Sequence, residues 1–322
     1  MYPWTQSNPP EAIAAMYKYF KQAWNLIRQE RLFSAIYIVG TGLSITAVMA
    51  LSIVLYIKLA NIYPETNRHR ILVVNGAGEL MKEDKGMWAS CLSVKAIEAC
   101  FYPLESAEAV TAFMIAHLST DDAVQLEGKA RAELPVMTKY IDPQFWTVYP
   151  FRFIEGKPFG EAEFKSGLPV AVVSRSLARK LFGTDKGATG RYFSLNFKQY
   201  QVSGVVRDAS FATNRSYGDL FVPYTVVPNY GEGGGLEGSL GAFQAVILAP
   251  SAADLPKVKA EALERIERYS STLRDVTFSV FDQPDSHWES IFRMGGNHRP
   301  DYTAIIRQYL LIFLALLLVP AV

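Results

Sequence analysis

The feature that most constrains this chain is a long uncharged stretch, Leu32–Ile57, bounded by Arg31 and Lys58. At a rise of about 1.5 Å per residue, a helix of this length exceeds the ~30 Å hydrocarbon core of a bilayer. It lacks the polar stripe that a soluble helix of this length normally carries. We therefore predict a first transmembrane helix over residues 32–58. A cleaved signal peptide is the alternative, and it is disfavoured because the apolar run is too long and begins far from Met1.

Two different segments precede this stretch. Residues 1–15 hold three prolines and little apolar periodicity, which predicts a disordered tail, and Met16 is itself a candidate translation start. Over residues 16–31, apolar and aromatic side chains recur at helical spacing while basic and polar ones occupy the other face. This pattern predicts an amphipathic helix on the membrane surface. An ordinary surface helix of a soluble domain is the alternative, and the directly adjoining apolar stretch argues against it.

The distribution of charge predicts how the chain crosses the membrane. Basic residues outnumber the one nearby acid, Glu30, on the N-terminal side of the apolar stretch (Lys18, Lys21, Arg28, Arg31). The positive-inside tendency then places the N-terminus in the cytoplasm and the long following segment across the membrane, in the periplasm or outside the cell. Basic residues on the far side weaken this asymmetry (Arg68, Arg70, Lys82). We expect a protein embedded in the lipid bilayer.

Net charge and cysteine content limit the remaining possibilities. A net charge of +1 over 322 residues gives no electrostatic footprint for nucleic acid, so no nucleic-acid partner is expected. Cys91 and Cys100 lie in a segment, SCLSVKAIEACF, that reads as a helix. Nine helical residues span about 13 Å, beyond the ~7 Å that a disulfide allows between Cα atoms. Two free cysteines are predicted, and a disulfide would require that this segment is not helical.

Residues 61–300 read as one large mixed domain. Runs rich in β-branched and aromatic residues predict strands at Ile71–Val74, Val110–Ala116, Ala123–Leu126, Val170–Val173, Tyr192–Leu195, Tyr200–Val206, Leu220–Tyr224 and Phe243–Leu248. Helical spacing of apolar residues predicts helices at Val94–Phe101, Pro143–Tyr149, Ser174–Phe182 and Asp254–Ser271. Strands and helices do not alternate strictly, which favours the α+β fold class over a doubly wound parallel sheet.

A second apolar run lies at the C-terminal end, within residues 303–322. Its uncharged core, Tyr309–Val319, is too short for a comfortable span by itself. We interpret it as a partial second transmembrane helix that returns toward the cytoplasm. The chain is therefore expected to be cut short within this helix.

No stretch of the sequence predicts a catalytic, cofactor-binding or metal-binding site. The glycine-rich segment Gly231–Gly241 lacks the Lys-Ser/Thr pair of a phosphate-binding loop and precedes a strand, so a mobile hairpin loop is expected. Other candidates lack the spacing of metal, calcium or nucleophile motifs: His69, His117, His287, His298, Asp121, Asp122, Glu161, Glu163, Ser174 and Ser176. We predict no catalytic, cofactor or metal residues, and no enzymatic activity.

From residue 140 onward, four segments occur in an order that resembles a known family. They are YIDPQFWTVYPFRFIEGKPF (140–159), LPVAVVSRSLARKLFG (168–183), GATGRYFSLNFKQYQVSGVVRD (187–208) and DLFVPY (219–224). Gly183 stands where a helix must stop, Gly190 where a strand is entered tightly, and Gly204 where a bulge or close approach interrupts a strand. Together they are similar to the periplasmic core domain of MacB/FtsX-type ABC transporter permeases. The N-terminal segment KYFKQAWNLIRQERLFSAIYIVGTGLSI also resembles that family's entry helix and first transmembrane helix.

This resemblance implies a transmembrane permease subunit of a type VII ABC export or mechanotransmission system. It also implies a location in the bacterial inner membrane, with the large domain in the periplasm. Such permeases have four transmembrane helices and form homo- or heterodimers. They bind a separate cytoplasmic ABC ATPase, and their periplasmic domain engages an adaptor or cargo protein. This chain has no Walker motif, so the resemblance implies that a partner subunit hydrolyses ATP. Helices three and four of the family pattern are not in this sequence.

Two other classes of protein fit parts of the pattern. A membrane-anchored sensor would hold a ligand-binding domain between two transmembrane helices, and its signalling output would follow the second helix. A secreted enzyme with a membrane tether would need a catalytic cluster, which the sequence does not suggest. The sequence after Val322 or the neighbouring genes would distinguish the permease from the sensor.

Overall fold

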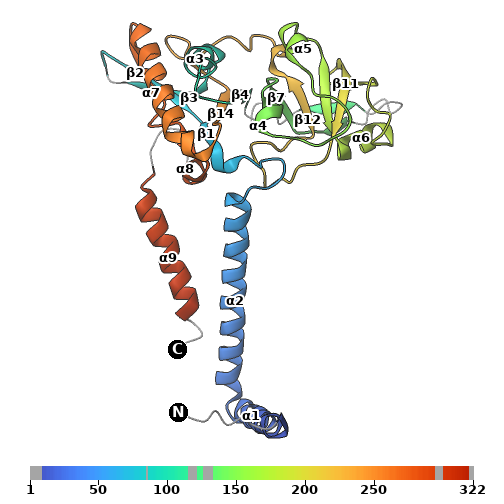
Figure 1. Cartoon of the computed structure of the whole chain (residues 1–322), viewed down its shortest axis with the longest axis vertical. Helices are drawn as coiled ribbons and strands as arrows, with labels where there is room; N and C mark the ends of the chain where they lie inside the picture. The colour runs from blue at the N-terminus through green and yellow to red at the C-terminus, as the bar shows by residue number, and fades with distance from the viewer. Residues whose placement is uncertain (1–8, 85, 115–121, 126–132, 294–299, 319–322) are drawn as a thin grey trace, which may run out of the picture. The chain divides into compact units, whose positions relative to one another are not determined.

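The computed structural model describes residues 9–84, 86–114, 122–125, 133–293 and 300–318. Figure 1 shows the whole chain. The chain forms two compact units. One contains residues 1–56 and 303–322, and the other contains residues 57–302.

The first unit is helical. Helix α1 (Pro9–Gln29) and helix α2 (Arg31–Leu59) are separated at Glu30, and helix α9 (Tyr302–Leu318) is the C-terminal helix. Among the described residues, α2 alone is long and apolar enough to cross a membrane. It is 29 residues long and agrees with the predicted span. The 17 residues of α9 fall short of the ~20 that a span needs.

The predicted N-terminal tail is partly helical, because α1 begins at Pro9 and not at Met16. Proline is favoured in the first turn of a helix, where its missing N–H is not needed. The following residues Glu11 to Ala15 are mostly alanine and isoleucine, which tolerate or favour a helix. Residues 1–8 of the expected tail lie outside the described residues.

The second unit is built on a mixed sheet of 16 strands, ordered β15-β2-β3-β14-β4-β7-β12-β9-β11-β10-β5-β6 along its main path. Strands β1 and β13 attach to β14 and β3, β16 pairs with β1, and β8 pairs with β11. The strands are β1 (Ile71–Val74), β2 (Ala77–Met81), β3 (Met87–Leu92), β4 (Ala109–Met114), β5 (Ala123–Gln125), β6 (Glu133–Pro135), β7 (Thr138–Ile141), β8 (Phe153–Gly156), β9 (Val170–Ser174), β10 (Tyr192–Leu195), β11 (Lys198–Val206), β12 (Leu220–Pro223), β13 (Leu240–Gly241), β14 (Phe243–Leu248), β15 (Val276–Ser279) and β16 (Asp285–Ser286).

Helices cover parts of this sheet, with α3 and α7 beside the strands around β1 and β14 (Figure 1). The helices of the domain are η1 (Arg68–Arg70), α3 (Val94–Cys100), α4 (Phe145–Val148), α5 (Glu161–Lys165), α6 (Arg175–Phe182), η3 (Tyr224–Val226), η4 (Ala252–Asp254), α7 (Leu255–Thr272) and α8 (His287–Phe292). Two strand pairs are parallel, β7 with β12 and β9 with β11, and the other paired strands are antiparallel. Helices and both kinds of strand pairing in one sheet confirm the α+β class.

The strands and helices predicted from the sequence are present within a few residues of their expected bounds. Eight strands were not predicted: β2, β3, β6, β7, β8, β13, β15 and β16. Of these, β13 and β16 have only two residues and carry no periodic pattern. The prediction that Cys91 and Cys100 share one helix was wrong: Cys91 lies on strand β3 and only Cys100 lies on helix α3. The prediction of two free cysteines is nevertheless confirmed. Ser93 separates the two elements by capping α3, accepting a hydrogen bond from the Ala96 amide at 3.1 Å.

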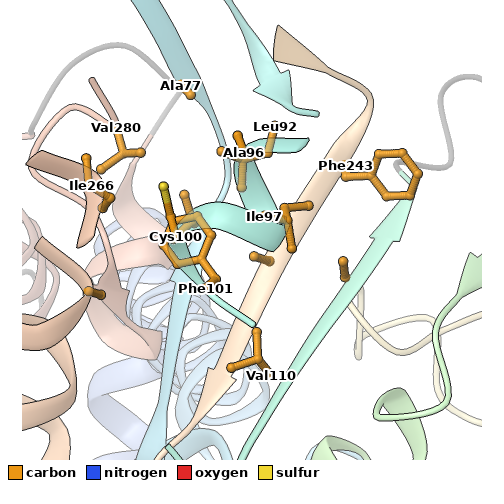
Figure 2. Packing of buried hydrophobic residues seen from close by; sticks show 14 of the residues in the cluster. Ala77, Leu92, Ala96, Ile97, Cys100, Phe101, Val110, Phe243, Ile266 and Val280 are labelled. Carbon is orange, nitrogen blue, oxygen red and sulfur yellow. The ribbon is translucent and has the colours of Figure 1, made fainter. Parts of the chain in front are cut away.

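Three clusters of buried apolar residues form the core of this domain. In the largest, α3 and α7 pack against strands of the sheet through Ile97, Phe101 and Ile266 (Figure 2). A second cluster is aromatic and centres on Phe145, whose ring lies within 6.2 Å of five other aromatic rings. The third lies around β9, β11 and helix α6. These contacts keep the domain rigid enough to position the polar groups described below.

Two glycines of the predicted pattern have the roles expected for them. Gly183 ends α6 with a φ of 74°, the left-handed conformation that follows many helices. At Gly204 the pairing of β11 with β9 shifts register. A side chain there would meet the Lys157 carbonyl oxygen at 2.8 Å, so only glycine allows the close approach of β8 to β11.

The glycine-rich loop between η3 and β13 is held by a buried carboxylate. Glu79, on β2, is fully buried, and its side chain accepts hydrogen bonds from the backbone amides of Leu236, Glu237 and Ser239. An ionised carboxylate that receives several amide hydrogens forms strong, charge-assisted hydrogen bonds. The segment forms the expected hairpin, closed by an antiparallel bridge between Gly234 and Leu240, and its backbone is anchored to the domain by Glu79.

Replacing Gly235 with alanine tests this anchor. Gly235 has a φ of +82°, and an added Cβ would overlap Glu79 Oε2. Gly187→Ala is the matched control, because its φ is +73° and nothing lies within 4 Å of the added carbon. We expect G187A to cost about 1 kcal/mol of unfolding free energy and G235A about 3 kcal/mol, since only the latter adds overpacking. Urea unfolding of the two variants compares them, and equal costs would contradict the anchor.

A second buried carboxylate, Asp142, connects three elements of the domain. Its Oδ1 accepts from Thr111 Oγ1 at 2.7 Å and from the Phe145 amide at 3.1 Å. Its Oδ2 accepts from Tyr102 Oη at 2.8 Å and from the Ala112 amide at 2.7 Å. Burial raises the pKa of Asp142 to about 6, and these four donors oppose that shift. Asp142 thus ties the start of α4 to β4 and to the end of α3.

Candidate functional site

The most polar buried region of the domain surrounds the last turn of α2. This turn belongs to the same compact unit as the domain, which begins at Ile57. The final carbonyl groups of any helix have no partner within the helix. Here Arg68 Nη1 donates to the carbonyl oxygens of Ile57 and Ala60, each at 2.7 Å, and to that of Lys58 at 3.4 Å. A guanidinium also complements the negative end of the helix dipole.

Glu65 fixes the orientation of Arg68. The two side chains form a buried ion pair, in which Arg68 Nε and Nη2 both lie 2.8 Å from Glu65 Oε2, and each side chain is only 3% exposed. The other oxygen, Oε1, accepts from the backbone amide and the hydroxyl of Ser216, each at 3.0 Å. Because all these groups are withdrawn from water, losing one partner leaves the others uncompensated.

His287 makes a further contact with the same helix turn. It is the first residue of α8, and its Nε2 lies 2.9 Å from the Lys58 carbonyl oxygen. A carbonyl oxygen only accepts, so Nε2 carries the proton and Nδ1 of the neutral ring is an acceptor. Burial lowers the pKa of His287 to about 4, partly offset by its hydrogen bond to Lys58. The ring is therefore neutral at pH 7.

A polar cavity of about 510 Å³ opens beside this network. Its lining is rich in nitrogen-bearing side chains: Lys58, Glu65, Arg68, Asn75, Cys91, Ala212, Asn214, Arg215, Gln244, His287, Ser290, Ile291 and Arg293. Arg293 is paired with buried Asp285 through two contacts, one of them Nη2 to Oδ1 at 2.9 Å. Burial raises the pKa of the Cys91 thiol to about 11, so this cysteine is protonated and unreactive at neutral pH.

The residues weighed in the sequence are not brought together in this region, with the exception of His287. Ser174 caps α6 by accepting from the Leu177 amide, and Ser176 Oγ donates to Asp208 at 2.9 Å. His69 lies 3.0 Å from the Asn61 side chain, and Glu163 binds the Gly160 amide at the start of α5. Asp122 accepts from Tyr140 and Asn196. His117, His298 and Asp121 lie outside the described residues.

Sequence reasoning missed the residues that hold the end of α2. Arg68 entered only as a basic residue beyond the predicted span and His287 only as an isolated histidine, and Glu65 was not singled out at all. A signal was present: an acid and an arginine three residues apart follow directly on a predicted transmembrane helix. Their partners Ser216 and His287 lie far away in sequence, so spacing could not reveal the contact. Within the described part of the chain, no three His, Cys, Asp or Glu residues converge on a metal position.

These features define a class of protein: a mixed α+β domain fastened to the end of a helix that can cross a membrane. The family model described as MacB-like periplasmic core domain matches residues 34–265. This chain belongs to that family, whose members are permeases of ABC-type transporters. Among curated protein sequences, none matches the chain.

Three solved structures are similar to this chain. The periplasmic region of MacB from Actinobacillus actinomycetemcomitans is 15% identical over 69% of this chain and 94% of its own, with a TM-score of 0.45. A domain of a putative permease protein from Porphyromonas gingivalis is 16% identical over 75% and 97%, with a TM-score of 0.47. The extracellular domain of the noncanonic ABC-type transporter YknZ from Gram-positive bacteria is 14% identical over 64% and 98%, with a TM-score of 0.43.

Proposed function

We propose that this chain is a transmembrane permease subunit of a type VII ABC export or mechanotransmission system. In this proposal a separate cytoplasmic ATPase hydrolyses ATP, and the permease conveys the resulting movement to the domain formed by residues 57–302. The domain lies in the periplasm and engages an adaptor or a cargo protein. The family membership and the apolar helix α2 support this proposal.

The observation that carries the proposal is the fastening of α2 to the domain. Arg68 and His287 bind the carbonyl groups of its last turn, and Glu65 and Ser216 hold Arg68 from the domain side. If the helix shifted relative to these residues, several buried charged hydrogen bonds would break and leave their donors and acceptors without partners, at a cost of several kcal/mol. A helix end held in this way passes on a displacement and does not absorb it. A flexible linker would do the opposite.

Orientation and assembly follow from the same proposal. The basic residues that precede α2 support a cytoplasmic N-terminus. Helix α1, with basic residues and aromatics, would lie along the cytoplasmic surface of the inner membrane. The subunit would pair with a second permease, either an identical or a different chain, through its membrane helices.

Affinity isolation of the tagged, natively expressed protein from its own membranes tests the function. We expect an ATPase with Walker motifs to co-purify in a fixed ratio, and its ATPase activity to rise when the complex is reconstituted in lipid. Isolation of a histidine kinase or methyl-accepting output on the same polypeptide would contradict the permease and support the sensor. An Arg68→Met complex is expected to retain ATPase activity but lose the response of that activity to the domain's ligand.

Replacing Gly42 with leucine tests the dimer. Apart from the backbone of its own helix and the adjoining residues, no atom of the described residues lies within 4 Å of a Cβ built at Gly42, so the change is not expected to disturb the subunit itself. In lipid, small residues allow two helices to approach closely, and a leucine would separate them. We expect G42L to lower the oligomer mass in detergent. Ala47→Leu, about 140° around the helix, is the control, and an unchanged mass for G42L would exclude Gly42 from the interface.

A further inference from the structure

The cavity beside the end of α2 contains cationic groups that no acid neutralises. Glu65 is the only acid among the described residues that line it, and its two carboxylate oxygens accept hydrogen bonds from Arg68 and from Ser216. Within the described ranges, neither Lys58 nor Arg215 forms an ion pair, whereas Arg293 is paired with Asp285. The cavity therefore has a surplus of positive charge from two side chains.

Arg215 is held in place but incompletely bonded. Its Nη2 donates to Ser290 Oγ at 2.9 Å, and Ser290 Oγ in turn donates to the His287 carbonyl oxygen at 2.7 Å. Its Nε is buried and has no hydrogen-bond partner. A buried donor without a partner costs about 1–3 kcal/mol, and a bound ligand that accepts its hydrogen would remove this cost. The planar guanidinium is suited to an oxyanion.

His287 also lines this cavity and has a second unpaired group. The residue is 7% exposed, and its Nδ1 is buried without a partner. Since Nε2 donates to the Lys58 carbonyl oxygen, Nδ1 accepts and requires a donor. A ligand that completes both groups must carry a negative oxygen for Arg215 and a hydroxyl hydrogen for His287. A phosphate in its singly protonated form carries both; with a second pKa of about 6, this form is about a tenth of the free ligand at pH 7 and increases as the pH falls.

We infer that this cavity binds a phosphate monoanion or phosphate monoester, with Arg215 and Lys58 at its anionic oxygens and His287 Nδ1 at its hydroxyl group. Sulfate and phosphodiesters have similar charge but no ionisable hydroxyl at neutral pH, so they leave His287 unpaired. Lys58 follows the apolar stretch directly, where lysines commonly reach lipid head groups. The phosphate can therefore come from solution or from a lipid with a monoester head group.

Calorimetric titration of the full chain in phosphatidylcholine nanodiscs tests the site with inorganic phosphate. We expect saturable binding that Arg215→Gln weakens about 10- to 100-fold, the range for a hydrogen bond to a charged group. Sulfate at matched ionic strength is expected to bind about tenfold or more weakly than phosphate, because it cannot satisfy His287. Arg274→Gln, an exposed arginine outside the cavity, is the control and should bind phosphate as the unchanged protein does.

The Arg215→Lys variant tests whether R215Q loses binding merely because the protein misfolds. Lysine keeps the positive charge at this position. If R215Q loses binding because the charge is gone, the phosphate affinity of R215K should stay within about tenfold of that of the unchanged protein. Absence of phosphate binding in the unchanged protein, equal affinity in R215Q, or sulfate binding as tight as phosphate would each overturn the proposal.

Lipid composition then separates the two sources of phosphate. Nanodiscs that contain some phosphatidic acid should weaken the apparent affinity for inorganic phosphate if the head group occupies the site. Phosphatidylglycerol, an anionic diester, should not. If phosphatidic acid has no effect while phosphate still binds, the ligand comes from solution. Equal competition by both lipids would overturn the assignment to a monoester.

Discussion

Replacing Arg68 with methionine is expected to destabilise the domain by about 3–5 kcal/mol, the usual cost of removing one partner from a buried ion pair. Glu65 would stay buried and charged, with only Ser216 to solvate it. The carbonyl groups at the end of α2 would lose a charged donor at the same time. Urea unfolding of the detergent-solubilised chain measures the loss. Hydrogen exchange should also rise locally over residues 57–70, because the helix end is released.

An exposed pair provides the matched control. Arg268 and Glu264 on α7 also form an arginine–glutamate pair at 2.8 Å, but both side chains are 68% exposed. Arg268→Met should change the unfolding free energy by less than about 1 kcal/mol. The double variant Arg68→Met, Glu65→Leu should recover part of the loss, since it removes the stranded charge. A cost for R68M as small as that of R268M would show that the pair does not hold the helix.

Replacing Asp142 with asparagine is expected to cost about 2–3 kcal/mol at pH 7. Both carboxylate oxygens receive a backbone amide, Phe145 on one side and Ala112 on the other. Whichever way the asparagine turns, its NH₂ group faces one of these donors, which cannot rotate away. Glu267→Gln, on the exposed side of α7, is the control and should have little effect.

The pH dependence of this difference has a definite sign. The pKa of Asp142 is raised to about 6 in the folded domain, against about 3.9 in an unfolded chain. The folded state therefore binds the extra proton between these values, so this group favours folding as the pH falls through 6. Protonated Asp142 can donate to Tyr102, whose hydroxyl lies 3.2 Å from that of Tyr224. We expect the gap between the unchanged protein and D142N to widen from pH 7 to pH 4; a narrowing gap would contradict the raised pKa.

The periodic parts of this fold could be predicted from the sequence. Helix α2 was evident from its uncharged length, and α7 from an apolar face that repeats every three to four residues. Strands β1, β10 and β14 were placed with their observed bounds, because alternating or β-branched runs end at turn-forming residues. The helix assignment around Cys91 failed because short apolar runs fit a strand and a helix equally well.

The candidate site could not be predicted in the same way. Glu65 and Ser216 are separated by 151 positions, and Lys58 and His287 by 229. Such residues come together only in the folded domain, and their contact cannot be inferred from a single sequence. The sequence also did not indicate which charged residues are buried. Glu79, Asp142 and Arg68 have ordinary sequence surroundings, yet each is enclosed by the domain and bonded to backbone groups.

The neutral state of His287 affects how the stability of the domain depends on pH. Its pKa near 4 means that the unfolded chain takes up a proton first as the pH drops below about 6.5, which disfavours folding. Asp142 acts in the opposite sense over nearly the same interval, and each effect amounts to about 3 kcal/mol. The two contributions offset each other between pH 6 and pH 4. Between pH 6 and pH 4, one buried acid and one buried base thus contribute to the stability of the domain with opposite signs.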